Sequence, residues 1–117
     1  MIVKKPWGTY EVLLDEPNYK VKRIVVHPYE RFSLQYHKHR EEHWVVVEGD
    51  GIVQVNQKEY PAYVRTHWVI LPTQKHRATA GPNGLVFIET QTGDCYEEDI
   101  VRLEDDYGRL GSSEVSV

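Results

Sequence analysis

The stretch QYHKHREEHWVVVEG, residues 35–49, carries three histidines and three glutamates around a run of valines. In a strand, successive side chains point to opposite faces. One face would carry Ser33, Gln35, His37 and His39, and the other Phe32, Leu34, Tyr36 and Lys38. We therefore expect a polar face that lines a barrel interior, where imidazoles need partners. The opposite, apolar face would be covered by a second sheet or a second subunit.

The rest of the chain repeats this strand-like pattern. Runs rich in valine, isoleucine, tyrosine and tryptophan occur at 9–14, 19–27, 32–39, 42–48, 52–55, 62–64, 67–71, 76–80 and 85–91. Turn-forming residues separate them, GPNG at 81–84 among them. This rhythm predicts an all-β sandwich or barrel. Only residues 95–109 have a composition that allows a short helix, and the tail 111–117 is expected to be flexible.

Length and composition fit one compact domain, expected to span residues 1–110. The chain has 117 residues, 40% of them hydrophobic, and a net charge of -4 with its basic residues spread along the sequence. We therefore expect one core and no nucleic-acid partner. No apolar segment approaches the roughly 20 residues that span a bilayer, and no signal peptide is evident, so no membrane partner is expected. The single cysteine, Cys95, excludes an internal disulfide, and the expected location is the cytoplasm.

The histidines of the opening stretch have the spacing of a metal site. A two-residue turn of Arg40 and Glu41 would place Glu42 directly opposite His39. His37 lies on the same face as His39 because the two are separated by one residue. Two imidazoles and one carboxylate would then converge.

A further ligand has to come from a distant strand, and His76 follows a proline turn in LPTQKHR. His43 is a weaker candidate ligand than Glu42, because its side chain would point to the opposite face of the strand unless the turn contains a bulge. His27 and His67 are interpreted as ordinary surface or core histidines. The resulting ligand set suits a divalent metal, zinc in the first place, with manganese, cobalt, iron or nickel as alternatives. The competing interpretation is a solvated hairpin of mixed charge.

The pattern HKHREEHWVVVEG followed by ILPTQKH resembles the two cupin motifs. These are a His-x-His hairpin whose glutamate precedes a glycine at a fixed distance, and a proline turn that leads to a histidine. Glu42 and Gly49 have that separation. KPWGTYEVL at 5–13, YKVKRIVVHPYE at 19–30 and EEDIVRLEDDYGR at 97–109 are in addition similar to the type II phosphomannose isomerase domain. The resemblance runs from Pro6 to Arg109.

This resemblance implies a jelly-roll cupin of the double-stranded β-helix type that interconverts mannose 6-phosphate and fructose 6-phosphate. In that family the cupin domain commonly follows a mannose-1-phosphate guanylyltransferase domain in one bifunctional chain. The length of this chain cannot hold both domains, so no nucleotide transfer is expected. Two details depart from the family pattern. Pro72 reaches His76 in a shorter turn that lacks a glycine, and the loop ATAGPNG differs from an Asn-Pro-Gly turn, so the pocket rim is expected to differ.

An aldose to ketose isomerisation through an enediol needs a base, an oxyanion stabiliser and a phosphate anchor. The metal ligands would be His37, His39, Glu42 and His76. Gln35 joins the candidate site because another phosphomannose isomerase class uses a Gln-x-His pair at its metal. Arg40 occupies the arginine of the family's His-x-His-Arg motif and is expected to contact the phosphosugar. Glu89 and Lys22 are the candidates for the base, and Lys22 is also a candidate substrate contact.

Two other functions stay open at this point, because one fold carries many functions. The first is a non-catalytic sugar-binding or regulatory cupin, and the second is a cupin epimerase or ketoisomerase that acts on a nucleotide sugar. The metal ligand set favours the isomerase. A homodimer is expected as well, because the apolar face of Phe32, Leu34 and Tyr36 would need a cover.

Overall fold

The computed structural model describes residues 1–96 and 98–108, which fold into nine strands without a helix. The strands are β1 (Ile2–Lys5), β2 (Gly8–Asp15), β3 (Tyr19–Val26), β4 (Leu34–Tyr36), β5 (Arg40–Val55), β6 (Lys58–Tyr63), β7 (His67–Ile70), β8 (His76–Gly93) and β9 (Val101–Glu104). The all-β prediction is confirmed. A short helix within 95–109 is wrong for the described part, because residues 101–104 pair with β4 as a strand. The predicted tail, 111–117, lies outside the described residues.

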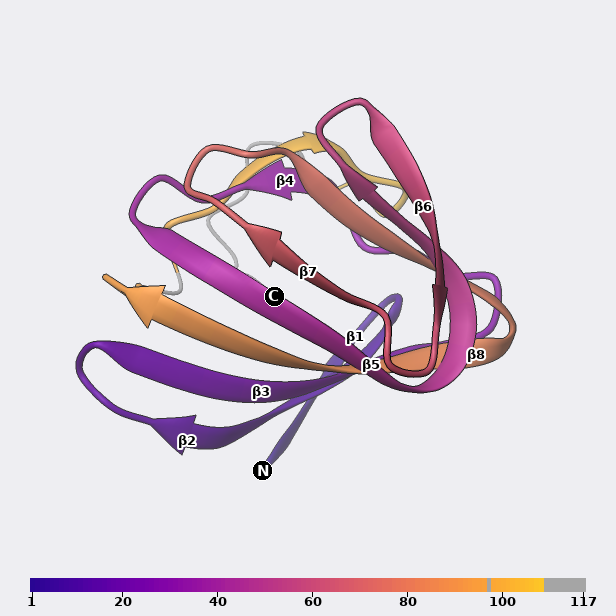
Figure 1. Cartoon of the computed structure of the whole chain (residues 1–117), viewed down its shortest axis with the longest axis horizontal. Coiled ribbons are helices and arrows are strands. Elements are labelled where there is room, and N and C mark those ends of the chain that lie inside the picture. Colours follow the sequence, from indigo (N-terminus) through magenta and orange to yellow (C-terminus); the bar gives the residue numbers. More distant parts are fainter. Residues whose placement is uncertain (97, 109–117) are drawn as a thin grey trace.

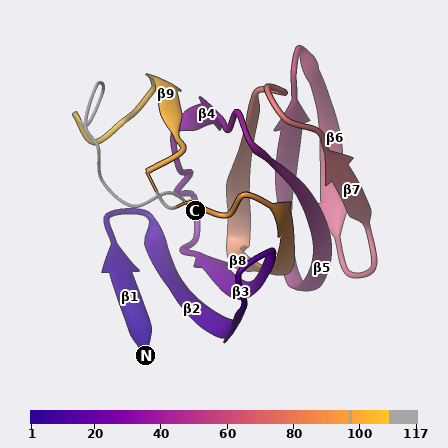
Figure 2. The same cartoon turned by 90° about the vertical axis from the view of Figure 1, so that its left-hand side faces the viewer.

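β5 and β8 connect the two ends of the sheet. The strand order is β1-β2-β3-β8-β4-β9, and β5 pairs with β8 on one edge and with β6 and β7 on the other. All these pairings are antiparallel. The sheet curls so that β4 and β9 face β3 and β5 across the interior (Figures 1 and 2). The chain therefore forms a half-barrel with one inner and one outer face.

Both long strands bend at glycines. The register of β5 against β8 shifts between Val46 and Glu48, and again between Gly49 and Gly51. Gly49 and Gly84 have φ angles of 81° and 76°, in the left-handed region that side chains disfavour. Such irregularities bend a strand and increase its twist. The bends allow β5 and β8 to contribute to two walls of the half-barrel.

The inner faces of β3, β8 and β5 form layers that change from apolar to polar along the barrel. Read across the strands, these layers are Ile24 with Phe87 and Val46, Lys22 with Glu89 and Trp44, and Lys20 with Gln91 and Glu42. All nine side chains are buried. The apolar end continues into an aromatic cluster in which Phe32 lies 5.5 Å from Trp7 and 5.9 Å from Trp44, centroid to centroid. Buried charges require partners, so the polar end is the candidate functional end.

The predicted apolar outer face of Phe32, Leu34 and Tyr36 is wrong. Phe32 belongs to the hydrophobic core, Leu34 is buried, and Tyr36 is half-buried. β4 contains only three residues, and its pairing with β9 is irregular between Leu34 and Gln35. Strand alternation therefore does not extend back to Phe32. The apolar outer face from which a homodimer was predicted is not present.

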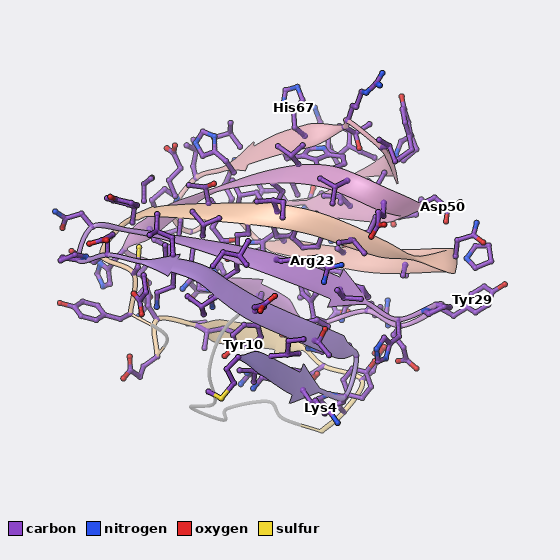
Figure 3. The ribbon with its side chains drawn as sticks, turned by 90° about the horizontal axis from the view of Figure 1, so that it is seen from below. Lys4, Tyr10, Arg23, Tyr29, Asp50 and His67 are labelled. Carbon is purple, nitrogen blue, oxygen red and sulfur yellow. The ribbon has the colours of Figure 1, made fainter. Side chains whose placement is uncertain are left out.

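The outer face of the sheet runs from β7 to β1 (Figure 3). His67 lies at one edge, Lys4 at the other, and Arg23 of β3 between them. Val45, Val47 and Val69 are partly exposed on β5 and β7. Within the described residues there is no helix long and apolar enough to span a bilayer.

Replacing Gly49 with alanine is expected to lower the free energy of unfolding by about 3 kcal/mol or more. An added Cβ would lie 2.0 Å from the carbonyl oxygen of Gly84, and the φ angle is also unfavourable. Gly108→Ala is the matched control, since its φ is 75° but no atom of the described residues lies within 4 Å of an added Cβ. It should lose only about 1 kcal/mol. Urea unfolding measures both losses, and equal losses would contradict the steric argument.

Candidate metal centre

Three buried side chains bring metal-binding atoms together at the polar end of the barrel. One ligand atom from each of His37, Glu42 and His76 lies within 4.8 Å of the others. His37 Nδ1 is 3.3 Å from Glu42 Oε2, and His76 Nε2 is 3.7 Å from Glu42 Oε1. The two imidazole rings are stacked with their centroids 5.0 Å apart. One carboxylate and two imidazoles form a donor set that divalent first-row metals accept.

Strand pairing explains why residues distant in sequence converge here. His37 follows directly after β4, and Gln35 of β4 pairs with His76, the first residue of β8. Glu42 pairs with Gln91 near the other end of β8. Because the sheet curls, both ends of β8 contribute to the same interior.

The short turn before His76 is held by hydrogen bonds that fix its direction. Gln74 Oε1 accepts from the backbone N–H of Leu71 at 2.8 Å, and Gln74 N donates to Leu71 O at 3.1 Å. Thr73 N donates to His37 O at 2.7 Å, which ties this turn to the segment after β4. The turn is shorter than the family pattern, yet it brings His76 to the group.

Further hydrogen bonds orient the candidate ligands. His76 Nδ1 lies 2.9 Å from Gln74 O, which only accepts, so Nδ1 carries the proton and Nε2 presents its lone pair on the side of Glu42. Trp44 Nε1 donates to Glu42 Oε1 at 3.0 Å. Burial lowers the pKa of His76 to about 4. Burial and the charge of Arg40 hold the pKa of His37 well below its ordinary value. Both rings are therefore neutral at neutral pH, as metal ligands must be.

The structure does not bring His39 to this group. β4 ends at Tyr36 and β5 begins at Arg40, so the residues between them do not continue the alternation on which the prediction relied. His39 is exposed, and its backbone N–H donates to the Asp99 carboxylate at 2.8 Å. Glu42 pairs with β7 and β8, so the predicted pairing of Glu42 with His39 is wrong.

The remaining histidines also lie apart from the group. His43 is exposed, and its Nε2 lies 2.7 Å from Glu41 Oε2 on the outer face, as its parity predicted. His27 and His67 are exposed as well. His27, His43 and His67, the histidines ranked low from sequence, therefore lie outside the candidate site.

Arg40 is buried against the candidate ligands. Its Nε and Nη2 donate to Glu42 Oε2 at 2.8 and 2.7 Å. Nη2 also lies 2.9 Å from His37 Nε2, and Nη1 donates to Tyr96 O at 3.5 Å. Arg40 therefore lines the barrel and is not an exposed turn residue, which was the alternative its sequence position allowed.

Arg40 and a metal ion cannot both contact His37 in this way. A guanidinium only donates, so His37 Nε2 accepts and the neutral ring carries its proton on Nδ1. Coordination through Nδ1 would move that proton to Nε2 and remove the acceptor. Coordination through Nε2 would displace Arg40 directly. Either way, metal binding at His37 requires Arg40 to release the ring.

The residues present fit a divalent metal and an oxygen-rich ligand. Gln35 Oε1, Glu89 Oε2 and Gln91 Oε1 are buried and find no hydrogen-bond partner among the described residues. Gln35 Nε2 donates to Ser33 O at 3.3 Å and to Ser33 Oγ at 3.2 Å, which fixes the amide. Buried unpaired acceptors cost free energy, and each needs an explanation. A metal or sugar hydroxyl groups would supply the missing partners.

Glu89 and Lys22 lie opposite each other across β3 and β8, one layer deeper than Glu42. Gln91 Nε2 donates to Glu89 Oε1 at 2.5 Å, and Lys22 Nζ is 4.5 Å from the ring centroid of Tyr10. Burial and the charge of Glu42 raise the pKa of Glu89 to about 7. Sequence reasoning missed Gln91, although it has the same strand parity as Glu89 in LVFIETQ.

Comparison with known families identifies the family of this chain. A family model described as Mannose-6-phosphate isomerase C-terminal matches residues 1–105. Curated relatives include a mannose-1-phosphate guanylyltransferase of Klebsiella pneumoniae, 36% identical, and the alginate biosynthesis protein AlgA of Pseudomonas aeruginosa, 39% identical. The alignments cover 92% and 98% of this chain but 23% and 24% of those proteins. The chain therefore spans about a quarter of the length of these relatives.

Solved structures show the same architecture. An RmlC-like cupin from Shewanella frigidimarina has a TM-score of 0.73 at 20% identity, and covers 80% of this chain and 83% of its own. The capsular polysaccharide assembling protein CapF from Staphylococcus aureus has a TM-score of 0.78 at 18% identity, and covers 89% of this chain and 32% of its own. The cupin fold predicted from sequence is confirmed.

Replacing Glu89 with glutamine is expected to change the pH dependence of stability in chelator-treated protein. The folded-state pKa of Glu89, about 7, exceeds its ordinary value of 4.5, so wild type loses free energy of unfolding as pH rises through this interval. The loss is at most about 3 kcal/mol. His37 and His76 titrate in both proteins and largely cancel in the difference. Urea unfolding from about pH 5 to pH 8 should show wild type losing stability relative to the variant. A constant difference would contradict the raised pKa.

Replacing Arg40 with methionine is expected to strengthen zinc binding about tenfold or more, because the variant removes a competing positive charge beside Glu42 and frees His37. Calorimetric titration measures the affinity. Arg23→Met is the matched control, since Arg23 is partly exposed on the outer face and pairs with Glu48. Weaker zinc binding would show instead that Arg40 supports Glu42 as a ligand.

Proposed function

The chain belongs to the mannose-6-phosphate isomerase C-terminal family, and from this membership we propose that it is a metal-dependent aldose-ketose isomerase acting on mannose 6-phosphate and fructose 6-phosphate. The observation that carries the proposal is the buried group of His37, Glu42 and His76 beside unpaired polar atoms. A purely structural ion-pair cluster would not need those unpaired acceptors.

We place the metal on His37, Glu42 and His76, with Gln35 Oε1 as a further oxygen donor. Zinc is the first choice for two imidazoles with oxygen donors, and manganese, cobalt, iron or nickel remain alternatives. When bound, the metal would polarise the carbonyl and hydroxyl oxygens of the sugar. His39 is excluded from this ligand set because it is exposed.

Glu89 is the proposed base. Gln91 fixes its Oε1, and its buried Oε2 has no hydrogen-bond partner in the described part of the chain, so Oε2 is the atom that would take the proton from C2 of the aldose. The same atom returns the proton to C1, while the C2 hydroxyl proton moves to the oxygen on C1. A pKa of about 7 suits a group that must both accept and release a proton near neutral pH.

Lys22 and Arg40 act as substrate contacts in this proposal. Lys22 lies next to Glu89, with its Nζ over the Tyr10 ring, so it favours the ionised form of Glu89 and would donate to the enediol oxygens. Metal binding at His37 would release Arg40 from the ring, and Arg40, held beside Glu42, would then contact substrate oxygens. Both assignments agree with the roles expected from the sequence.

A sugar-binding cupin without catalysis is the competing function. The observation that favours it is the contact of Arg40 with Glu42, which balances the buried carboxylate without a metal. Action on a nucleotide sugar, as an epimerase or ketoisomerase, is the third possibility considered. It would leave the buried ligand group without a role.

A homodimer and a cytoplasmic location remain predictions. A homodimer would have to use the exposed valines of the outer face, Val45, Val47 and Val69, because Phe32 belongs to the core and Leu34 is buried. The chain would act in the cytoplasm, where phosphosugars are available.

A coupled assay for fructose 6-phosphate formation tests the proposed reaction. Chelator-treated protein should be inactive and should recover with zinc, cobalt or manganese. His37→Ala should lower kcat/KM at least about a hundredfold and weaken metal binding, because it removes a ligand. His39→Ala is the matched control, and it should change neither quantity more than about twofold because the ring is exposed. Metal binding without turnover of either sugar would favour the sugar-binding function.

A further inference from the structure

Gln91 is a buried amide in the wall of the barrel at its polar end. It pairs with Lys20 of β3 on one side and with Glu42 of β5 on the other, so it lies in the same layer as a candidate metal ligand. Its relative exposure is 0%. Within the described residues, no group donates a hydrogen bond to Gln91 Oε1. Glutamine is usually exposed, and a buried acceptor without a donor calls for an explanation.

The orientation of this amide is fixed by its neighbour on β8. Gln91 Nε2 donates to Glu89 Oε1 at 2.5 Å. Rotating the amide by half a turn would set Gln91 Oε1 against Glu89 Oε1, and two acceptors repel each other. Gln91 Oε1 is therefore held as an acceptor that is directed away from this carboxylate oxygen. In the proposed reaction the proton goes to Glu89 Oε2, so Oε1 stays an acceptor and the amide keeps its orientation.

A fixed acceptor selects the groups that can bind beside it. A hydroxyl group can donate to Gln91 Oε1, whereas a deprotonated phosphate or a carbonyl oxygen cannot. Two neutral N–H donors of the same interior already have acceptors. Trp44 Nε1 donates to Glu42 Oε1, and Gln35 Nε2 donates to Ser33 O and Oγ. A hydroxyl group of a ligand is thus the donor that fits this position.

The position next to Glu89 narrows the choice of hydroxyl group. Glu89 Oε2 is the atom proposed to take the proton from C2, and Gln91 is bonded to the other oxygen of the same carboxylate. Gln91 Oε1 therefore lies beside the place where the reacting carbons C1 and C2 would bind. The oxygens on C1 and C2 exchange carbonyl and hydroxyl character during the isomerisation. The oxygen on C3, the next carbon, keeps its hydrogen in substrate, enediol and product, so it suits an acceptor that cannot turn.

We propose that Gln91 is a specificity-determining residue, which accepts a hydrogen bond from the C3 hydroxyl group of the sugar while its Nε2 positions Glu89. This inference rests on the proposed function and deepens it. A sugar without a hydroxyl group on C3 would leave Gln91 Oε1 without a donor in the complex. Sites built around a buried polar group reject analogues of this kind.

Gln91→Met tests the inference, because it keeps the length of the side chain and removes both polar atoms. By titration calorimetry, wild type should bind 3-deoxy-mannose 6-phosphate at least about tenfold more weakly than mannose 6-phosphate. The variant should bind these two sugars with equal affinity. The relative affinity for the 4-deoxy analogue should be the same in both proteins. Gln54→Met is the matched control, since Gln54 Nε2 donates to Asn56 O at the surface, and it should discriminate as wild type does.

Two results would overturn the inference. One is a folded Gln91→Met protein that rejects the 3-deoxy sugar as strongly as wild type does, and the other is a wild type that binds both sugars equally. Turnover of mannose 6-phosphate with either result would leave the isomerase standing. Discrimination that depends on Gln91, in a protein without turnover, would support the inference and overturn only the isomerase. No binding of mannose 6-phosphate would overturn both.

A second measurement uses the wild-type protein, in case Gln91→Met does not fold. The side-chain carbonyl carbon Cδ of Gln91, in protein with 13C-labelled glutamine and assigned through Gln91→Glu, reports on a hydrogen bond to Oε1. Its resonance should shift on addition of mannose 6-phosphate and should shift clearly less with the 3-deoxy analogue. Equal shifts with both sugars, or no shift with either, contradict the inference.

Discussion

The antiparallel pairing of β5 with β8 is the constraint on which the rest of the structure depends. It places Trp44 opposite Glu89 and Glu42 opposite Gln91, and it continues past the glycine bend to the segment that begins with His76. A candidate ligand, its hydrogen-bonding tryptophan and the proposed base are thus fixed by one ladder of backbone hydrogen bonds. Groups held by a paired backbone keep their separation better than groups on loops, which is what catalysis by positioning requires.

The same ladder concentrates charge in the interior, and the side chains compensate for it locally. Arg40 contacts the Glu42 carboxylate, Lys22 faces Glu89, and Gln91 fixes one oxygen of Glu89. Because burial makes each unpaired charge expensive, these contacts are interdependent. Any ligand that enters must exchange one of them for a contact of comparable strength. The unpaired oxygens of Gln35, Glu89 and Gln91 show where such exchange costs least.

The sequence predicted much of this arrangement where a strand continues undisturbed. Alternation placed Gln35 and His37 on the inner face correctly, and the separation of Glu42 from Gly49 identified the carboxylate through the family motif. Glu89 and Lys22 were named as candidates for the base, and both are buried. The cupin fold followed from the same motifs.

Sequence reasoning failed where the strand ends. His39 was assigned to the inner face because alternation was carried past Tyr36, where β4 stops. Phe32 was assigned to the outer face for the corresponding reason, because alternation was carried back past Leu34, where β4 begins. Lys20 and Gln91 were missed because a charged or amide residue with inward parity is normally interpreted as a residue at the wet end of a strand. Only the three-dimensional layers show that both are enclosed.

The contact of Arg40 with Glu42 and His37 has a consequence for how the proposed metal would be acquired. Many small metal-binding domains remain unfolded until their ion arrives, so their abundance follows the ion supply. Here the chain provides its own cation at the carboxylate of Glu42, which would allow the barrel to form first and bind a metal afterwards. Metal loading would then be separate from folding, and the ion available in the cell at that later moment would help to determine which metal is bound.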